Sequence, residues 1–185
     1  MLERAVRPLG RLLRSRRADP ALSVRALPPY AAPATIEVTS ASFEPGGPIG
    51  TRQAGPGRGD NLSPQLTVAG LPAATAQLLL IMEDPDVPLR RPVLHMIALL
   101  DPGSTDFAEG ALTPDNPHVT WVPAFQGRTG YAGPRALPGH GVHRYGFHVY
   151  ALDEVLPRVT SFAGLTAAVE GHVLARGCLE GTQEG

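Results

Sequence analysis

The stretch that decides the fold runs from residue 141 to residue 152 and reads Gly141-Val142-His143-Arg144-Tyr145-Gly146-Phe147-His148-Val149-Tyr150-Ala151-Leu152. Aromatic and β-branched residues dominate it, which is typical of a β-strand. Alternate side chains of a strand share a face, so His143 and Tyr145 are predicted to point one way and Arg144 the other. Apolar side chains follow His143 and Tyr145 on their face. The pattern therefore predicts a polar pocket at the mouth of this strand.

Other segments extend the same architecture. Four further strands are expected at 35–43, 77–82, 93–100 and 118–122. Long loops rich in glycine and proline separate them at 44–64 and 127–141, and the chain's 20 Pro and 21 Gly argue against a helical bundle. Thr160-Ser161 is expected to cap a helix that runs to about Arg176, with Gly177 just beyond its end. The sum is a mainly β, antiparallel domain with one helix near its C-terminus.

A second polar cluster follows the apolar run at 77–82. It consists of Asp84-Pro85-Asp86-Val87-Pro88, with His95 in the next apolar run. A residue before proline avoids the helical region, so the two carboxylates are expected on a rigid turn. An imidazole near a carboxylate can donate from both ring nitrogens to an oxyanion, and a Tyr hydroxyl adds a neutral donor. Such a pocket favours holding an anion, although each motif alone also fits a turn or an ordinary core histidine.

Catalytic and metal sites have weaker sequence support. The chain has no Gly-x-Ser-x-Gly nucleophile turn and no phosphate-binding Gly-Lys loop, so no catalytic residue and no enzymatic activity are expected, with a hydrolase as the minor alternative. A metal site is the rival interpretation of the carboxylates and imidazoles Asp84, Asp86, His95, His140 and His143. His140 and His143 lie on a turn rather than on one face of a helix. No metal or cofactor is therefore expected.

The N-terminus differs from the rest in charge. Residues 1–25 hold seven Arg against two acids, whereas residues 26–185 hold nine Arg against fifteen acids. The main body thus shows no basic footprint for nucleic acid. On a helix, Leu2, Val6, Leu9 and Leu13 would share one face and Arg4, Arg7, Arg11 and Arg14 the other. This arm could fray, dock on the domain, contact an anionic membrane or serve as a targeting segment.

The same region bears on domain organisation and location. Residues 19–34 are rich in proline and predict an extended linker, which divides the chain into an arm and linker at 1–34 and a domain at 35–185. No run resembles a signal-peptide core, and the single Cys178 suits a reducing compartment, so a cytoplasmic location is expected. All sixteen cations are Arg, a bias that favours a bacterial source with a GC-rich genome.

Taken in order, the motifs resemble the phosphatidylethanolamine-binding protein family, and in particular its bacterial Raf kinase inhibitor-like branch. The first matching motif is Asp84 to Pro88 followed by His95 to Leu100. The second is Gly130-Tyr131-Ala132-Gly133-Pro134 followed by Gly141 to Phe147, and a weaker third match lies at Asp60 to Leu66. The resemblance covers residues 35–180.

The resemblance implies a large antiparallel sheet packed on a smaller one, with a C-terminal helix. It implies an anion pocket lined by Asp84, His95, His143 and Tyr145, with Asp86 supporting the turn and with Tyr131 and the Gly133 backbone as a wall. The implied function is non-enzymatic: binding of a phosphate-like or carboxylate ligand, with regulation of a kinase or another signalling partner. A protein-docking module with a vestigial pocket is the alternative.

Several positions depart from the family pattern. Met96 stands where an aromatic residue usually follows the first pocket histidine, and Gln65 and Val68 replace a proline and a tryptophan. A double proline before the second motif is replaced by Arg135-Ala136-Leu137-Pro138, which is followed by Gly139 and His140. Arg135 is either a rim cation or a solvated loop residue.

Overall fold

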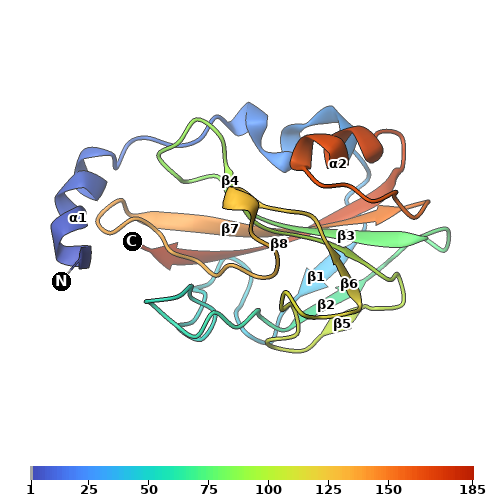
Figure 1. Cartoon of the computed structure of the whole chain (residues 1–185), viewed down its shortest axis with the longest axis horizontal. Coiled ribbons are helices and arrows are strands. Elements are labelled where there is room, and N and C mark those ends of the chain that lie inside the picture. Colours follow the sequence, from blue (N-terminus) through green and yellow to red (C-terminus); the bar gives the residue numbers. More distant parts are fainter. Residues whose placement is uncertain (1) are drawn as a thin grey trace.

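The computed structural model describes residues 2–185, with side chains from residue 5 onward. Its frame consists of two antiparallel sheets, one of five strands in the order β6-β4-β3-β7-β8 and one of three in the order β1-β2-β5 (Figure 1). The strands are β1 (Glu37–Thr39), β2 (Leu66–Ala69), β3 (Gln77–Asp84), β4 (Val93–Leu100), β5 (Asp106–Phe107), β6 (Val119–Trp121), β7 (Val142–Leu152) and β8 (Val173–Glu184). The helices are α1 (Leu2–Leu12) and α2 (Phe162–Ala168), with 3-10 helices η1 (Pro20–Leu22), η2 (Val24–Ala26), η3 (Pro28–Tyr30) and η4 (Phe125–Gly127). The predicted mainly β class with a large sheet on a small one is confirmed.

Both faces of the five-stranded sheet are buried. On one face Leu80 and Phe147 pack toward the small sheet, and on the other Ile81 packs with residues of α2 and the 3-10 helices. This explains why 77–82 and 93–100 are continuous apolar runs rather than alternating ones. In β7 the predicted alternation is confirmed, since Tyr145 and Phe147 belong to the first cluster and Tyr150 to the second.

The segment expected to be an extended linker is folded. Residues 20–30 form the three consecutive helices η1, η2 and η3, and Val24 and Tyr30 are fully buried against the large sheet. Glu83 of β3 accepts hydrogen bonds from the Ser23 hydroxyl at 2.6 Å and from the Val24 amide at 2.9 Å. Proline indicated an extended chain, but its φ of about −65° suits the first turn of a helix equally well.

The predicted C-terminal helix is shorter than expected, and the chain ends in a strand. Ser161 caps α2 as predicted, because its hydroxyl accepts the Gly164 amide at 3.1 Å, but α2 ends at Ala168. From residue 173 onward the chain pairs with β7 along its whole length. Gly177 is therefore a strand residue, and an added Cβ there would lie 2.3 Å from the Ile36 carbonyl oxygen. A helical spacing of apolar residues over 162–173 concealed this strand, since its pairing partner lies elsewhere in the sequence.

Helix α1 docks at the end of the large sheet near the start of β7 (Figure 1). The contact is close, because a Cβ on Gly10 would lie 2.0 Å from the Pro138 carbonyl oxygen. Leu9 and Leu12 remain 49% and 78% exposed, while the side chains of residues 2–4 lie outside the described residues. Across residues 2–185, no helix combines the length and the hydropathy needed to cross a bilayer.

Candidate functional site

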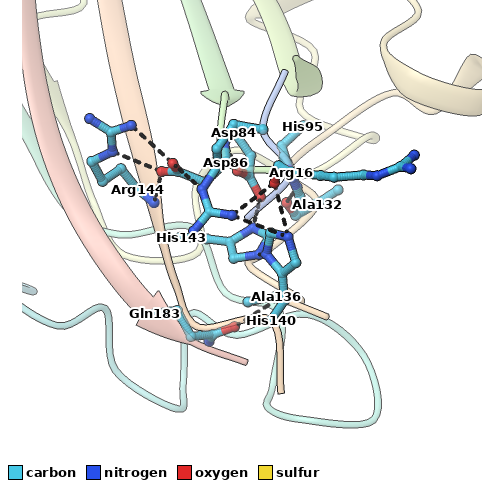
Figure 2. Close-up of polar contacts among 11 residues, drawn as sticks. Arg16, Asp84, Asp86, His95, Ala132, Ala136, His140, His143, Arg144 and Gln183 are labelled. Atoms are coloured by element: carbon cyan, nitrogen blue, oxygen red, sulfur yellow. Dashed lines mark hydrogen bonds and ion pairs between the residues drawn. The ribbon is translucent and has the colours of Figure 1, made fainter. Parts of the chain in front are cut away.

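The turn after β3 and the start of β7 meet at one end of the large sheet. Strand β3 pairs with β7 up to Glu83 opposite Gly146, which brings Asp84 beside His143. His143 Nδ1 lies 2.8 Å from Asp84 Oδ2, and Asp84 Oδ1 accepts the Asp86 amide at 2.9 Å (Figure 2). Both side chains are buried. The two polar motifs of the sequence therefore form a single buried pair.

His95 reaches the same place from β4. Its Nδ1 lies 2.8 Å from the Ala132 carbonyl oxygen, and because a carbonyl can only accept, Nδ1 carries the proton. This bond leaves Nε2 as the ring nitrogen available to a ligand in the cavity that His95 lines. Burial lowers the pKa of His95, and the Asp84 charge offsets only part of this effect. In the protein without a ligand, the His95 ring is thus neutral at pH 7 and presents a hydrogen-bond acceptor at Nε2.

Tyr145 lies beneath the two histidines. Its ring centroid is 5.4 Å from that of His95 in an edge-on contact and 6.4 Å from that of His143. Burial, followed by the nearby Asp84, raises the pKa of Tyr145, so the phenol stays protonated. Its hydroxyl is fully buried, does not line the cavity and interacts with the Asp84 carboxylate. Tyr145 therefore supports the pair of histidines and Asp84 from the core side.

A cavity of about 490 Å³ opens above these side chains. Its titratable lining is Asp84, His95 and His143 together with Arg58, Arg128 and Arg135. Its apolar lining includes Val87, Leu89, Leu94, Phe125 and Leu137, and Val6 of α1. The lining therefore combines cationic side chains with an apolar wall. Arg135, which the sequence left open between rim and solvated loop, is part of this lining.

The remaining predicted residues have separate places. Gly133 lines the cavity, but its amide donates to Asn61 Oδ1 at 2.8 Å rather than into the cavity. Tyr131 is buried outside the lining, and its hydroxyl donates to the Gln53 carbonyl oxygen at 2.9 Å. Thus Asp84, His95, His143 and Gly133 come together at the cavity, while Tyr145 supports it from behind and Tyr131 holds a neighbouring loop.

Asp86 holds the turn rather than the cavity. Its Oδ2 accepts hydrogen bonds from the Arg144 amide at 2.9 Å and from Arg144 Nε at 2.8 Å. Its Oδ1 accepts hydrogen bonds from Arg144 Nη2 at 2.9 Å and from Arg17 Nε at 3.0 Å. Burial opposes its ionisation, but the bonds from Arg144 outweigh burial and the pKa of Asp86 is lowered. Asp86 therefore joins the β3–β4 turn to β7 and to the N-terminal arm.

Sequence reasoning missed three residues of the site. Asn61 adopts φ +57° and bridges the Tyr131 carbonyl oxygen and the Gly133 amide, a use that the Asp60-Asn61 pair in a glycine-rich loop could have indicated. His140 was considered as a metal ligand, but its ring lies 2.8 Å from His143 Nε2. No sequence pattern near Arg17 indicates its contact with Asp86, which lies 69 positions away.

The metal interpretation gains no support from this geometry. Among residues 5–185, no group of three or more His, Cys, Asp or Glu side chains is arranged to hold a metal ion. Both ring nitrogens of His143 contact other side chains, one on Asp84 and one on His140. A metal would have to displace one of these bonds.

With this geometry established, the chain can be compared with known proteins. Residues 39–184 match the family model described as phosphatidylethanolamine-binding protein. The chain belongs to this family. A UPF0098 protein of Pyrococcus horikoshii is 39% identical over 68% of this chain and 66% of its own length, and one of Chlamydia muridarum is 37% identical over 80% and 99%.

Solved structures agree with the family assignment. A phosphatidylethanolamine-binding protein homologue of Chlamydia trachomatis superposes with a TM-score of 0.72 at 33% identity, covering 82% of this chain and 98% of that one. Escherichia coli YbcL superposes with a TM-score of 0.75 at 24% identity, covering 82% and 99%, which shows a shared fold.

Location and source stay predictions. A Mycobacterium tuberculosis relative, 35% identical over 80% of this chain and 71% of its own length, is provisionally named lipoprotein LppC. The relatives include archaeal as well as bacterial proteins. The comparisons therefore decide neither the cytoplasmic location nor the bacterial origin.

Proposed function

We propose that this protein is a non-enzymatic binding protein that holds a small anionic ligand, with a phosphate-like or carboxylate group, in the cavity at the end of β3, β4 and β7. The supporting observation is the charge of the lining. Arg128 and Arg135 are among the lining residues together with Arg58, and Asp84 is the one carboxylate among the described lining residues. That carboxylate is already bonded to His143. An entering anion thus meets arginine side chains, and His95 adds a charged donor once its Nε2 is protonated.

The absence of a nucleophile in this lining favours binding over catalysis. No Ser, Thr or Cys occurs among the described residues that line the cavity. Ser, Thr and Cys are the usual nucleophiles of acyl transfer, and each needs a base beside it. Here the imidazoles bond to a carbonyl oxygen, a carboxylate and each other instead.

The apolar wall narrows the ligand class. Leu89 and Phe125 are partly exposed and line the cavity together with Leu94 and Leu137. An inorganic anion would leave this wall in contact with water, whereas an organic phosphate or carboxylate would cover it. We expect an organic anion to bind more tightly than inorganic phosphate.

Thermal unfolding of the full chain with phosphate, phosphoethanolamine, phosphoserine and citrate tests this function. A ligand at about 100 times its dissociation constant adds about 2.7 kcal/mol to the free energy of unfolding. The shift should disappear in His95→Ala and persist in His172→Ala, a matched change at a surface histidine paired with Asp153. A folded wild-type protein that none of these anions stabilises would instead indicate a docking module with a vestigial pocket.

A peripheral membrane contact is a second candidate, and a separate observation favours it. Leu9 and Leu12 are exposed on α1, next to the exposed Arg7 and Arg11. An exposed apolar edge beside Arg side chains suits an anionic membrane surface. Sedimentation with vesicles rich in phosphatidylserine should be weakened by the double change Leu9→Ser and Leu12→Ser, but not by Val155→Ser at another exposed apolar site. Equal sedimentation of all three proteins would exclude this contact.

A further inference from the structure

The N-terminal arm reaches the site through the residues that follow α1. The Arg16 carbonyl oxygen lies 3.1 Å from His140 Nε2, and Arg17 Nη1 lies 3.2 Å from the same nitrogen. Arg17 also bonds Asp86 through Nε at 3.0 Å. Arg17 therefore spans two groups of the site at once, the carboxylate of the β3–β4 turn and the imidazole that contacts His143.

His140 connects the arm to the buried pair. Its Nδ1 lies 2.8 Å from His143 Nε2, and the two rings are close in Figure 2, with Asp84 on the far side of His143. Arg17, His140, His143 and Asp84 thus form one continuous chain of contacts. His140 is fully buried, and its contact with His143 and that of His143 with Asp84 are buried as well, whereas Arg17 is exposed.

The directions of the protons in this chain are constrained. Asp84 is a carboxylate, so His143 donates from Nδ1, and a neutral His143 then accepts at Nε2 from His140 Nδ1. A neutral His140 is left with a bare Nε2, and this nitrogen can accept from Arg17, which is always a donor. Every donor then points toward Asp84, and each contact supports the next.

A second pattern is possible if His140 gains a proton. Nε2 would then donate to the Arg16 carbonyl oxygen at 3.1 Å and would repel the Arg17 guanidinium. The groups around His140 are Arg17 and the carbonyl oxygens of Arg16 and Leu13 from the arm, and His143 from β7, with Asp84 behind His143 and Asp86 behind Arg17. Burial first, then His143 and Arg17, lowers the pKa of His140. The Arg16 and Leu13 carbonyl oxygens act in the opposite direction, but the net effect of these surroundings favours the neutral pattern.

We infer that Arg17 and His140 are positioning residues through which the N-terminal arm controls the anion cavity. While the arm is docked, Arg17 adds to the effect of burial that favours a neutral His140, and His140 contacts His143 Nε2. When Arg17 leaves, His140 takes up a proton at a higher pH and places a positive charge next to His143, which lines the cavity. The consequence for ligand binding rests on the proposed function, whereas the coupling of Arg17 to His140 does not.

The way the arm docks supports a specific role. Gly10 meets Pro138, and Gly139, at φ +80°, would place a Cβ 2.6 Å from the Arg7 carbonyl oxygen, so both sides of this contact lack room for a side chain. The loop that carries Pro138 and Gly139 ends in His140. A contact this close holds the arm in one register, which places Arg16 and Arg17 beside His140.

The direct test is an NMR titration of the His140 ring in the full chain. In Arg17→Leu we expect the titration midpoint of His140 to rise by about one pH unit, because the guanidinium that lies 3.2 Å from His140 Nε2 is gone. Arg11→Leu is the matched control, since Arg11 is an exposed arginine of the same arm, and it should leave the midpoint in place. An unchanged midpoint in Arg17→Leu, in a protein whose spectrum shows the native fold, would overturn the inference.

A double-mutant cycle tests the consequence for the cavity. An Asn amide nitrogen lies near the position of imidazole Nδ1, so His140→Asn can still donate to His143 but cannot titrate. We expect Arg17→Leu to strengthen sulfate binding as the pH falls, and to have no such effect in the His140→Asn background. An equal effect in both backgrounds would mean that Arg17 acts through its own charge and not through His140. If the wild type binds no anion, the proposed function fails, while the NMR titration still decides the coupling.

Discussion

Sulfate affinity should depend steeply on pH through a single ring nitrogen. Sulfate stays a dianion near neutral pH and brings no proton of its own. His95 Nδ1 is committed to the Ala132 carbonyl oxygen at 2.8 Å, so a neutral His95 offers sulfate only the lone pair of Nε2. Binding therefore requires a proton on Nε2, which turns this acceptor into a charged donor.

The magnitude follows from the pKa of His95 in the free protein. Burial holds this pKa below the ordinary value of 6.5. Above about pH 6.5 the protonated fraction falls tenfold per pH unit, so sulfate affinity should fall about a hundredfold over the next two units. This loss corresponds to about 2.7 kcal/mol of binding free energy. The sign is that of a group whose pKa rises on binding: affinity is gained as the pH falls.

Isothermal titration calorimetry at constant ionic strength measures this dependence, because the arginines of the lining contribute a salt-dependent attraction. Buffers of different ionisation enthalpy should report uptake of about one proton per sulfate bound. In His95→Asn the amide can still donate to Ala132, but the titrating nitrogen is lost, so the affinity should be weak and nearly independent of pH. A flat affinity across these two pH units in the wild type would refute the role of His95, and so would an unchanged slope in His95→Asn.

Three further predictions concern the arm, the sheet and the turn. Gly10→Val should displace α1, because the valine Cβ would lie 2.0 Å from the Pro138 carbonyl oxygen. Amide hydrogen exchange of the arm should then accelerate while β7 stays protected. Unchanged exchange in the arm would contradict the docking contact. Burial opposes protonation of His148, but contacts with Cys178 and Glu83 raise its pKa to about 9. The contribution of protonated His148 to the free energy of unfolding is therefore complete below about pH 6.5 and is lost as the pH rises through 9. Urea unfolding should show a loss of up to about 3 kcal/mol over this range, and this loss should disappear in His148→Gln. Asp86→Asn weakens the bonds from Arg144 and Arg17 and should lower the free energy of unfolding by about 1 to 3 kcal/mol, and urea midpoints equal to those of the wild type would count against the clamp.

Local patterns predicted the strands that carry the site. β7 has an alternation that identifies its two faces, and the apolar runs of β3 and β4 are long enough to indicate buried strands. β8 escaped detection because its residues follow a helical spacing and because its stability comes from pairing with β7. The 3-10 helices at 20–30 escaped because proline alone does not distinguish an extended chain from a helix start.

The sequence by itself predicted the mainly β fold class, because strand period and turn chemistry act over a few neighbouring residues, and its resemblance to the family pointed to Asp84, His95 and His143. The tertiary structure alone decided what surrounds them. Arg17 and Asp86 are 69 positions apart, and His140 and Arg17 are 123 apart. Such contacts depend on how the arm, the turn and the loops pack at the sheet end, and no local pattern encodes that packing. The pocket residues were thus readable from the chain, whereas the arm that holds His140 became visible only in the folded protein.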